Sequence, residues 1–427
     1  MILAAYYPPF MVAILTFVPL LLFHFRVPGA LGLALDVGSN HGLYYYAFYC
    51  VCSFYIAFIV SSNSLSSIKS FPHRKATSAR NMARNLRFSI IVYTLLLVSL
   101  GTIATIGAMQ YVDYTELLMA VIQNDSNVSL RLQLLSSEVP GIIRMMNYLI
   151  PSAIIILFGI VAAYERVKVT AGWFLCLFVF ILLAQILRGL IWMDRNSLFM
   201  IAVIGLLCIS TRVEFKRNYL YILGWLFSGV MIPILYVANV QATIRGGELL
   251  DTITIFNYAD LGMANASLAL TSTSNASLGM ESLFTPLATV PRGIGMGNIA
   301  FPSMDSEWIH NPAANLLTYT IYDFGYFGFI SYLVWGSVAG WIFNKRKTHR
   351  TSLVWNVAFL WLIYAVATIW TVPVSRGPDY WCGVLFSIVI SWRLDRLSSF
   401  RHRRPRAHMI TSKLPVTKSA LPRNWLD

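Results

Sequence analysis

The sequence predicts an all-α polytopic membrane protein, and three observations lead to this fold class. Hydrophobic residues make up 57% of the 427 residues and charged residues only 12%, with a mean hydropathy of +0.64. Soluble domains carry about 25% charged residues. The apolar residues also gather in runs that can cross a bilayer as helices, which satisfy their own backbone hydrogen bonds. Polar and mostly basic stretches separate these runs.

About ten apolar runs are predicted to be transmembrane helices, because one crossing needs about 20 apolar residues. They span residues 8–25, 43–61, 88–111, 146–164, 172–192, 196–212, 220–241, 317–343, 352–372 and 382–398. The first run follows no basic leader and precedes no small-residue cleavage site, which favours a retained helix over a signal peptide. The sixth run is short, so a re-entrant excursion over 172–212 is the alternative to two full crossings.

The connections between the runs predict the orientation. Five of them are basic and fall on one side: residues 69–87, 165–169, 212–217, 344–350 and 401–406. The positive-inside rule makes this side cytoplasmic and places both termini there. All eight lysines are then cytoplasmic. The net charge of +14 is thus explained by topology, and no nucleic-acid partner is predicted.

The chain divides into a membrane domain and a tail. The membrane domain, residues 1–398, includes residues 242–316, which are rich in Ser, Asn, Thr and Gly and are predicted to form one large loop on the outer side. Such a loop is too long to be a mere connection. The tail, residues 399–427, is basic and contains proline, which predicts a disordered cytoplasmic segment that is attracted to anionic lipid headgroups.

The outer side carries arginines and no lysine. These are Arg26, Arg131, Arg144, Arg195, Arg245, Arg292 and Arg376, and Arg188 lies just inside an apolar run. The arginine fork binds phosphate or carboxylate at two points, so the set fits a ligand that bears phosphates. Ion pairs with Asp113, Glu116 and Asp379 are the structural alternative.

Arg188 and Arg195 are the strongest arginine candidates. A charge within a transmembrane run is costly and usually faces a polar interior or a cavity. The two residues are seven apart, so they share one helical face if the helix continues between them. A surface ion pair between Arg195 and Asp194 is the alternative.

The predicted outer loop adds two candidate segments. In "RGIGMGN", residues 292–298, glycines follow Arg292 and allow the backbone to approach a phosphate closely; a flexible hinge is the alternative. In "MDSEWIHNP", Glu307 and His310 are three residues apart, and the imidazole can accept a proton from a hydroxyl near neutral pH. A histidine satisfied by hydrogen bonds within the loop is the alternative.

Hydrolytic and metal chemistry are not indicated by the motifs. The sequence has no HExxH motif, no G-x-S-x-G motif and no His/Cys cluster in its outer segments. The five cysteines lie in apolar runs without the spacing of a metal site or a disulfide framework. No cofactor and no metal are predicted.

Two segments resemble a known family. "NPAANLLTYTIYDFGYFGFISYLVWGSVAGWIF", residues 311–343, has an Asn-containing loop end and then the run "YDFGYFG" opening a helix. It resembles the penultimate-loop signature of the Wzy-type O-antigen or oligosaccharide repeat-unit polymerases. "RGLIWMDRNSLFMIAVIGLL", residues 188–207, is similar to the family's mid-chain arginine element, with Asp194-Arg195-Asn196 in place of the usual Ser-Arg pair.

The resemblance implies a membrane-embedded glycosyltransferase of the GT-C type in the bacterial inner (cytoplasmic) membrane. It implies that donor and acceptor are oligosaccharides linked to undecaprenyl pyrophosphate, that no metal is needed, and that a chain-length regulator protein is a partner. The growing chain moves from its carrier to the terminal sugar of an incoming lipid-linked repeat unit. Undecaprenyl pyrophosphate is released.

Under this interpretation the outer arginines bind the pyrophosphate: Arg195, Arg245 and Arg292, with Arg188 below them and Arg376 as a further contact unless it pairs with Asp379. His310, or else Glu307, accepts the proton of the attacking sugar hydroxyl. Asp323 is expected to orient Arg195 or Arg292, and accepting a sugar hydroxyl directly is the alternative. Gly325 and Gly328 are expected to permit close helix packing around it, and Tyr319, Tyr322 and Tyr326 suit an interfacial aromatic belt.

Three alternative functions remain. The related O-antigen ligase shares the fold and the lipid donor but transfers the glycan to the lipid A core. A transporter or flippase would use Arg188 and Asp323 to line a substrate path. A structural membrane protein is the third alternative.

Overall fold

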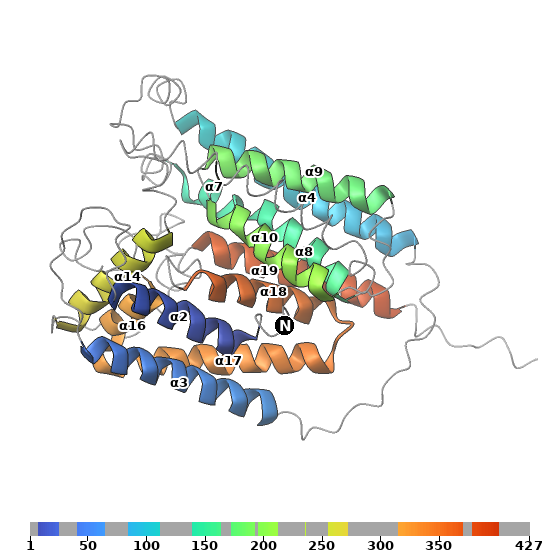
Figure 1. Ribbon diagram of the computed structural model, residues 1–427. Coiled ribbons are helices and arrows are strands. Elements are labelled where there is room, and N and C mark those ends of the chain that lie inside the picture. The colour runs from blue at the N-terminus through green and yellow to red at the C-terminus, as the bar shows by residue number, and fades with distance from the viewer. Residues whose placement is uncertain are drawn as a thin grey trace, which may run out of the picture.

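The computed structural model of the protein describes ten parts of the chain, which are residues 7–24, 41–64, 84–111, 139–163, 172–192, 195–211, 235, 255–271, 315–369 and 378–400. The secondary structure in these parts is entirely helical (Figure 1). The prediction of an all-α protein is therefore confirmed for the described residues.

The helices follow the hydropathy of the sequence closely. In chain order they are α2 (Pro8–His24), α3 (His41–Ser64), α4 (Arg84–Ala108), α7 (Gly141–Met146), α8 (Leu149–Ala163), α9 (Gly172–Ile191), α10 (Arg195–Thr211), α14 (Ile255–Thr271), α16 (Leu316–Phe324), α17 (Phe329–Thr348), α18 (Leu353–Ala367) and α19 (Pro378–Phe400). They coincide with nine of the ten predicted runs. The remaining run, 220–241, lies outside the described residues apart from Leu235.

Several helices are suited to a membrane. Four stretches of the described chain are long and apolar enough to cross a bilayer: His41–Ser62, Leu86–Tyr111, Gly141–Ala163 and Gly172–Gly189. The segments Leu316–Phe327 and Phe329–Thr348 meet the same criterion only as a pair, and they are bent by 117°. These helices agree with a membrane protein, while ten crossings and the GT-C fold remain predictions.

The helices form layers, which Figure 1 shows in side view. Helices α3 and α17 lie side by side along one side, and α4 and α9 lie along the opposite side. Between them are α8, α18 and α19, which pack on one another, and α10 packs on α8 and α18. Helices α14 and α16 lie together at one end, where α14 also packs on α2.

Two glycines bring α3 and α17 into close contact. A Cβ atom at Gly340 would lie 2.5 Å from the carbonyl oxygen of Phe58, and one at Gly336 would collide with the carbonyl oxygen of Phe54. The two glycines are one helical turn apart, so both backbones can approach along one stripe. Small residues of this kind allow helices to associate in a membrane, where burial of apolar surface provides little driving force.

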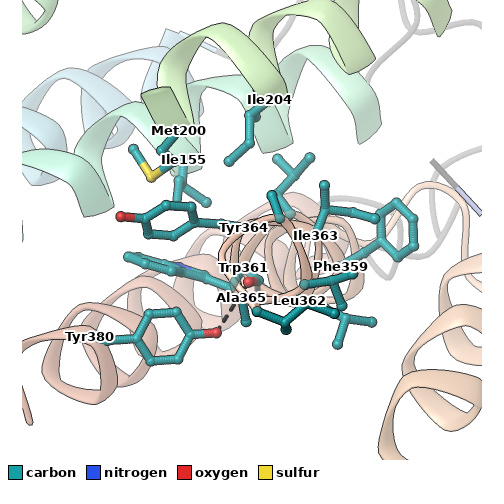
Figure 2. Close-up of a cluster of buried hydrophobic side chains, with 14 of the residues drawn as sticks. Ile155, Met200, Ile204, Phe359, Trp361, Leu362, Ile363, Tyr364, Ala365 and Tyr380 are labelled. Atoms are coloured by element: carbon teal, nitrogen blue, oxygen red, sulfur yellow. Dashed lines mark hydrogen bonds between the residues drawn. The ribbon is translucent and has the colours of Figure 1, made fainter. Parts of the chain in front are cut away.

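The core surrounds α18, whose side chains are buried on almost every side. Figure 2 shows its aromatic part, in which Trp361 and Tyr364 point toward Tyr380 of α19 and toward Ile155 and Met200. The rings of Trp361 and Tyr380 are 5.1 Å apart and nearly perpendicular. The Tyr380 hydroxyl donates a hydrogen bond to the backbone carbonyl of Trp361 over 3.1 Å, so the hydroxyl of this buried ring is satisfied.

A carboxylate from α19 caps the start of α18. Asp395 accepts hydrogen bonds from the backbone N–H groups of Leu353 at 2.9 Å and Val354 at 3.2 Å. It also accepts one from the Ser352 hydroxyl at 2.8 Å. The first N–H groups of a helix have no partner within it, and an anion there is also favoured by the helix dipole. Asp395 thus joins α18 and α19 at this end of the bundle.

The predicted helix over 317–343 is not continuous, and this expectation was wrong. The chain forms α16, a short 3-10 turn at Gly325–Phe327, and then α17 in a new direction. Gly325 adopts a φ of +54°, which L residues rarely tolerate, at the point where α16 ends. Glycine therefore ends the first helix and permits the sharp bend.

The predicted loop over 242–316 contains a helix. Helix α14 has 17 residues, and its described side chains are mostly buried, including those of Met263, Asn265 and Ser267. It packs on α2 and α16. This part of the segment belongs to the helical bundle and does not extend away from it as a loop.

Candidate functional site

The structure describes the side chains of two predicted site residues, Arg188 and Asp323. Arg195 is the first residue of α10, and only its backbone is described. The other predicted site residues lie outside the described residues: Arg245, Arg292, Glu307, His310 and Arg376. Their roles remain predictions, and the candidate site consists of the surroundings of Arg188 and Asp323.

Helix α9 has a buried face that becomes polar toward its C-terminal end. Residues three or four apart form this face: Phe174, Leu177, Ile181, Gln185, Arg188 and Trp192 are all buried. The opposite face exposes large apolar side chains, namely Leu175, Val179, Leu183 and Leu187. This division is the 3.6-residue periodicity of a helix with one side in the protein, and it turns Arg188 inward.

Arg188 is held at the junction between α7 and α8. Its side chain is only 1% exposed. The Nε–H group donates to the backbone carbonyl of Asn147 at 2.9 Å and to the Oδ1 atom of the same residue at 2.6 Å. The guanidinium carbon also lies 4.9 Å from the ring centre of Tyr148, within the range of a cation–π interaction. These two bonds to Asn147 come from Nε–H. The N–H groups of the two terminal nitrogens are those that can donate a parallel pair of hydrogen bonds to a phosphate.

The start of α10 lies beside the end of α9. A Cβ atom at Gly189 would lie 3.0 Å from the side chain of Leu198, in the first turn of α10. Helix α9 ends at Ile191 and α10 begins at Arg195. A shared face for Arg188 and Arg195 was expected only if one helix continued through both, and this condition is not met because the two residues belong to separate helices.

Asp323 lies in the last turn of α16 and has no exposed surface. A buried carboxylate is costly unless hydrogen bonds or a cation compensate it, and the C-terminal end of a helix also disfavours negative charge. Nearby, the Tyr46 hydroxyl of α3 donates to Thr320 Oγ1 over 3.3 Å. Thr320 in turn donates to the carbonyl of Leu317 at 2.8 Å. Asp323 thus lies in an enclosed polar part of the bundle.

Asn315 fixes the other end of α16. Its Oδ1 atom accepts hydrogen bonds from the backbone N–H of Thr318 at 2.9 Å and from its hydroxyl at 3.0 Å, which is the pattern of a helix N-cap. The same hydroxyl lies 3.1 Å from the carbonyl of Gly262 in α14. The N–H of Leu316 donates to the carbonyl of Ile369, just after α18, at 2.9 Å. The start of α16 is therefore fixed by contacts with α14 and with the end of α18.

Gly325 and Gly328 have different functions in the bend. A Cβ atom at Gly325 would meet nothing within 4 Å, so its role is the backbone angle given above. A Cβ atom at Gly328 would collide with the Tyr46 hydroxyl and lie 2.6 Å from the Thr320 carbonyl oxygen. The prediction of close packing holds for Gly328 and was wrong for Gly325.

The predicted aromatic belt is only partly supported. Tyr319 is 3% exposed and belongs to the interior, so its assignment to the belt was wrong. Tyr326 is 73% exposed and Phe327 is 65% exposed at the bend. These two rings, and not Tyr319, have the exposure that an interfacial position requires.

Arg188 and Asp323 lie toward the same end of the bundle but in different sets of helices. Arg188 is bonded beside α7, and Asp323 belongs to α16; Figure 1 shows α7, α14 and α16 at one end. Helix α9 packs on α4, α8 and α10, whereas α16 packs on α14 and α17. The basic residues Lys345, Arg346 and Lys347 are in the last turn of α17, away from its junction with α16.

The comparisons with known proteins do not extend this site. Among the described residues, no three His, Cys, Asp or Glu side chains gather in a way that would hold a metal ion. No protein-family model matches the chain, and neither does any curated protein or solved structure.

Proposed function

We propose that the chain is a membrane glycosyltransferase that polymerises undecaprenyl-pyrophosphate-linked oligosaccharide repeat units into O-antigen or a similar surface polysaccharide. The proposal starts from the resemblance of residues 311–343 and 188–207 to the Wzy-type polymerases. In this proposal the enzyme works at the periplasmic face of the bacterial inner membrane, with both termini in the cytoplasm and a chain-length regulator as partner.

The observation that carries the proposal is the position of Arg188. A permanently charged side chain with 1% exposure sits in an apolar helix, where its Nε–H group donates to Asn147. A site that binds pyrophosphate needs arginines of this kind, prepositioned and shielded from water, because electrostatic interactions are stronger where water is excluded. A purely structural arginine would be a costly choice in this helix.

Asp323 gives a second, weaker support. A fully buried carboxylate at the end of α16 requires cations or hydrogen-bond donors around it. An arginine of the substrate site would meet this requirement and would itself be oriented by the carboxylate. Arg195 and Arg292 are the candidates within this proposal.

The proposed reaction is a glycosyl transfer, in which one bond to the anomeric carbon forms and another breaks. A hydroxyl oxygen of the acceptor's terminal sugar forms a bond to the anomeric carbon of the donor chain. The bond from that carbon to the pyrophosphate oxygen breaks, and its electron pair leaves with undecaprenyl pyrophosphate. His310, or else Glu307, takes the hydroxyl proton. Arg188, Arg195, Arg245, Arg292 and Arg376 stabilise the charge on the leaving group.

The experiment that tests these roles is a set of single alanine variants at Arg188, Arg195, Arg292 and His310. Polymer ladders from cells that carry each variant in place of the wild-type protein report chain length. The proposal expects short or absent ladders for these variants and a normal ladder for Arg350→Ala, an exposed arginine after α17. Wild-type ladders from all four variants would place the active site elsewhere.

The bent helix pair favours a second function, transport of a lipid-linked sugar. Discontinuous helices with a charged residue at the break are frequent in transporters, and α16 and α17 form such a pair with Asp323 next to the bend. A transporter built from repeats would have a second broken helix in a matching position. Within the described residues, α16–α17 is the one bent pair, so the polymerase remains the preferred function.

A further inference from the structure

Trp192 is a buried hydrogen-bond donor next to Arg188. Its side chain is 7% exposed, and its Nε1 atom is buried without an acceptor among the described residues. Buried N–H groups almost always have a partner, because leaving one unpaired destabilises the folded chain. Because this donor lies one helical turn from a buried arginine, it suggests a ligand that supplies the acceptor, whereas the similar Nε1 of Trp361 lies in the aromatic core.

The position of Trp192 points to the same ligand as that of Arg188. The two residues are four apart, and the backbone N–H of Trp192 donates to the Arg188 carbonyl at 2.9 Å. This helical spacing places their side chains on one face. Both are buried on the inward face of α9.

The start of α10 adds a third source of N–H groups. It lies beside this turn of α9, as the contact between Gly189 and Leu198 shows. The first N–H groups of a helix have no partner within it, and its N-terminal end favours anions. Helix α10 has 17 residues, so its dipole is well developed.

We propose that Trp192 and Arg188 form one anion-binding site, in which the indole N–H and the guanidinium donate to oxygens of a pyrophosphate group. This inference rests on the proposed function for the identity of the ligand, the pyrophosphate of the lipid carrier. The indole N–H, the guanidinium and the first N–H groups of α10 are all hydrogen-bond donors, and the last two carry positive charge, which suits a phosphate and not a neutral sugar.

The burial of both side chains predicts how the ligand enters. Neither residue is open to solvent, so a headgroup that reaches them requires the groups packed around them to move apart. Association that requires such a rearrangement is slower than the usual docking of two open surfaces. Slow binding is therefore part of the proposal.

The test is binding of inorganic pyrophosphate to the purified full-length protein in detergent, measured by calorimetric titration. Trp192→Phe removes the N–H and keeps an apolar ring, so its dissociation constant should rise about tenfold or more, as expected for a lost bond to a charged group. Arg188→Ala should abolish binding. The matched control is Trp361→Phe, because Trp361 also has a buried Nε1 without an acceptor among the described residues but lies in the aromatic core of Figure 2. This control should bind as the wild type does.

A second variant protects the test against misfolding. Benzothienylalanine at position 192 has almost the shape of tryptophan but carries sulfur in place of the N–H. It should weaken pyrophosphate binding as much as Trp192→Phe does. Wild-type affinity in this variant would overturn the role of Trp192.

Further arms identify the source of the anion and separate this inference from the proposed function. In neutral-lipid nanodiscs, undecaprenyl pyrophosphate should compete with inorganic pyrophosphate, and phosphatidylglycerol should not. Equal competition by phosphatidylglycerol would contradict a pyrophosphate site. Binding that depends on Trp192, in a protein that does not polymerise repeat units, would support the site while refuting the polymerase. Polymerisation by a protein whose pyrophosphate binding does not depend on Trp192 would support the polymerase and refute the site.

Discussion

Arg188 and Asn147 are joined by two hydrogen bonds from a single N–H group, at 2.9 Å to the backbone carbonyl and at 2.6 Å to Oδ1. This contact ties the end of α9 to the junction of α7 and α8. It also fixes the plane of the guanidinium, since Nε lies in that plane. The contact therefore determines where the terminal amino groups of Arg188 are directed.

Replacing Asn147 by alanine removes the Oδ1 acceptor and leaves the backbone carbonyl. Because the lost bond is made to a charged group, the free energy of unfolding should fall by about 1.5–3 kcal/mol. Denaturant unfolding in detergent, followed by circular dichroism, measures the change. Wild-type stability of Asn147→Ala would mean that the backbone carbonyl alone holds Arg188.

Asn147→Asp is the matched variant, because it keeps an oxygen at the Oδ1 position. It should retain the stability of the wild type but bind pyrophosphate more weakly, since the added carboxylate repels a phosphate near Arg188. Calorimetric titration checks the affinity. An unchanged dissociation constant would separate Arg188 from the anion site.

Gly328→Ala should distort the bend between α16 and α17. The new methyl group would collide with the Tyr46 hydroxyl and approach the Thr320 carbonyl, and such overpacking typically costs about 1–3 kcal/mol. The double variant Tyr46→Phe/Gly328→Ala should recover part of the loss, because the hydroxyl is gone. Thermal unfolding of the wild type and of these two variants tests this order. No recovery in the double variant would assign the whole cost to the Thr320 carbonyl.

Gly340→Ala should destabilise the contact between α3 and α17, although alanine favours helices. A Cβ atom there would lie 2.5 Å from the Phe58 carbonyl oxygen, so a loss of about 1–3 kcal/mol is expected. Gly172→Ala in α9 is the matched control, because a Cβ atom there meets nothing within 4 Å. That control should raise stability by up to about 1 kcal/mol. Equal effects of the two substitutions would refute the close helix contact.

Asp323→Asn keeps the shape of the side chain and removes its charge. If the carboxylate orients an arginine of the substrate site, polymer ladders should shorten while the protein still folds. Gel-filtration profiles in detergent report folding, and ladders from cells report polymerisation. Normal ladders would reduce Asp323 to a folding contact.

Hydropathy predicted most of the helices because a membrane helix needs an apolar run, and this requirement is local. The bend at Gly325 was not predicted, since the run over 317–343 is apolar on both sides of it and hydropathy does not record backbone angles. The two glycines in "YDFGYFG" were the available signal. Gly325 has the positive φ, and Gly328 makes the close contact with Tyr46.

The site was predicted less completely than the fold. Arg188 was identified because a charge in an apolar run is visible in the sequence. Its anchor, Asn147, is 41 residues away, and only tertiary packing brings the two together. Trp192 could have been found by extending the inward face of α9 from Ile181 through Gln185 and Arg188 by helical spacing. Helix α14 was missed because its polar residues, among them Asn257, Asp260 and Asn265, and its small alanines give a weak apolar signal.

The most direct test of the account is polymerisation by the purified protein alone. The wild-type protein is reconstituted in liposomes and given one substrate, undecaprenyl-pyrophosphate-linked repeat units, without a lipid A acceptor or other proteins. Products are separated by gel electrophoresis, and released undecaprenyl pyrophosphate is measured in parallel. The wild-type protein should produce a ladder of lengthened chains and release one carrier per bond formed, and Arg188→Ala should give neither product. Unchanged repeat units with the wild-type protein, or their movement across the bilayer without lengthening, would contradict the proposed function.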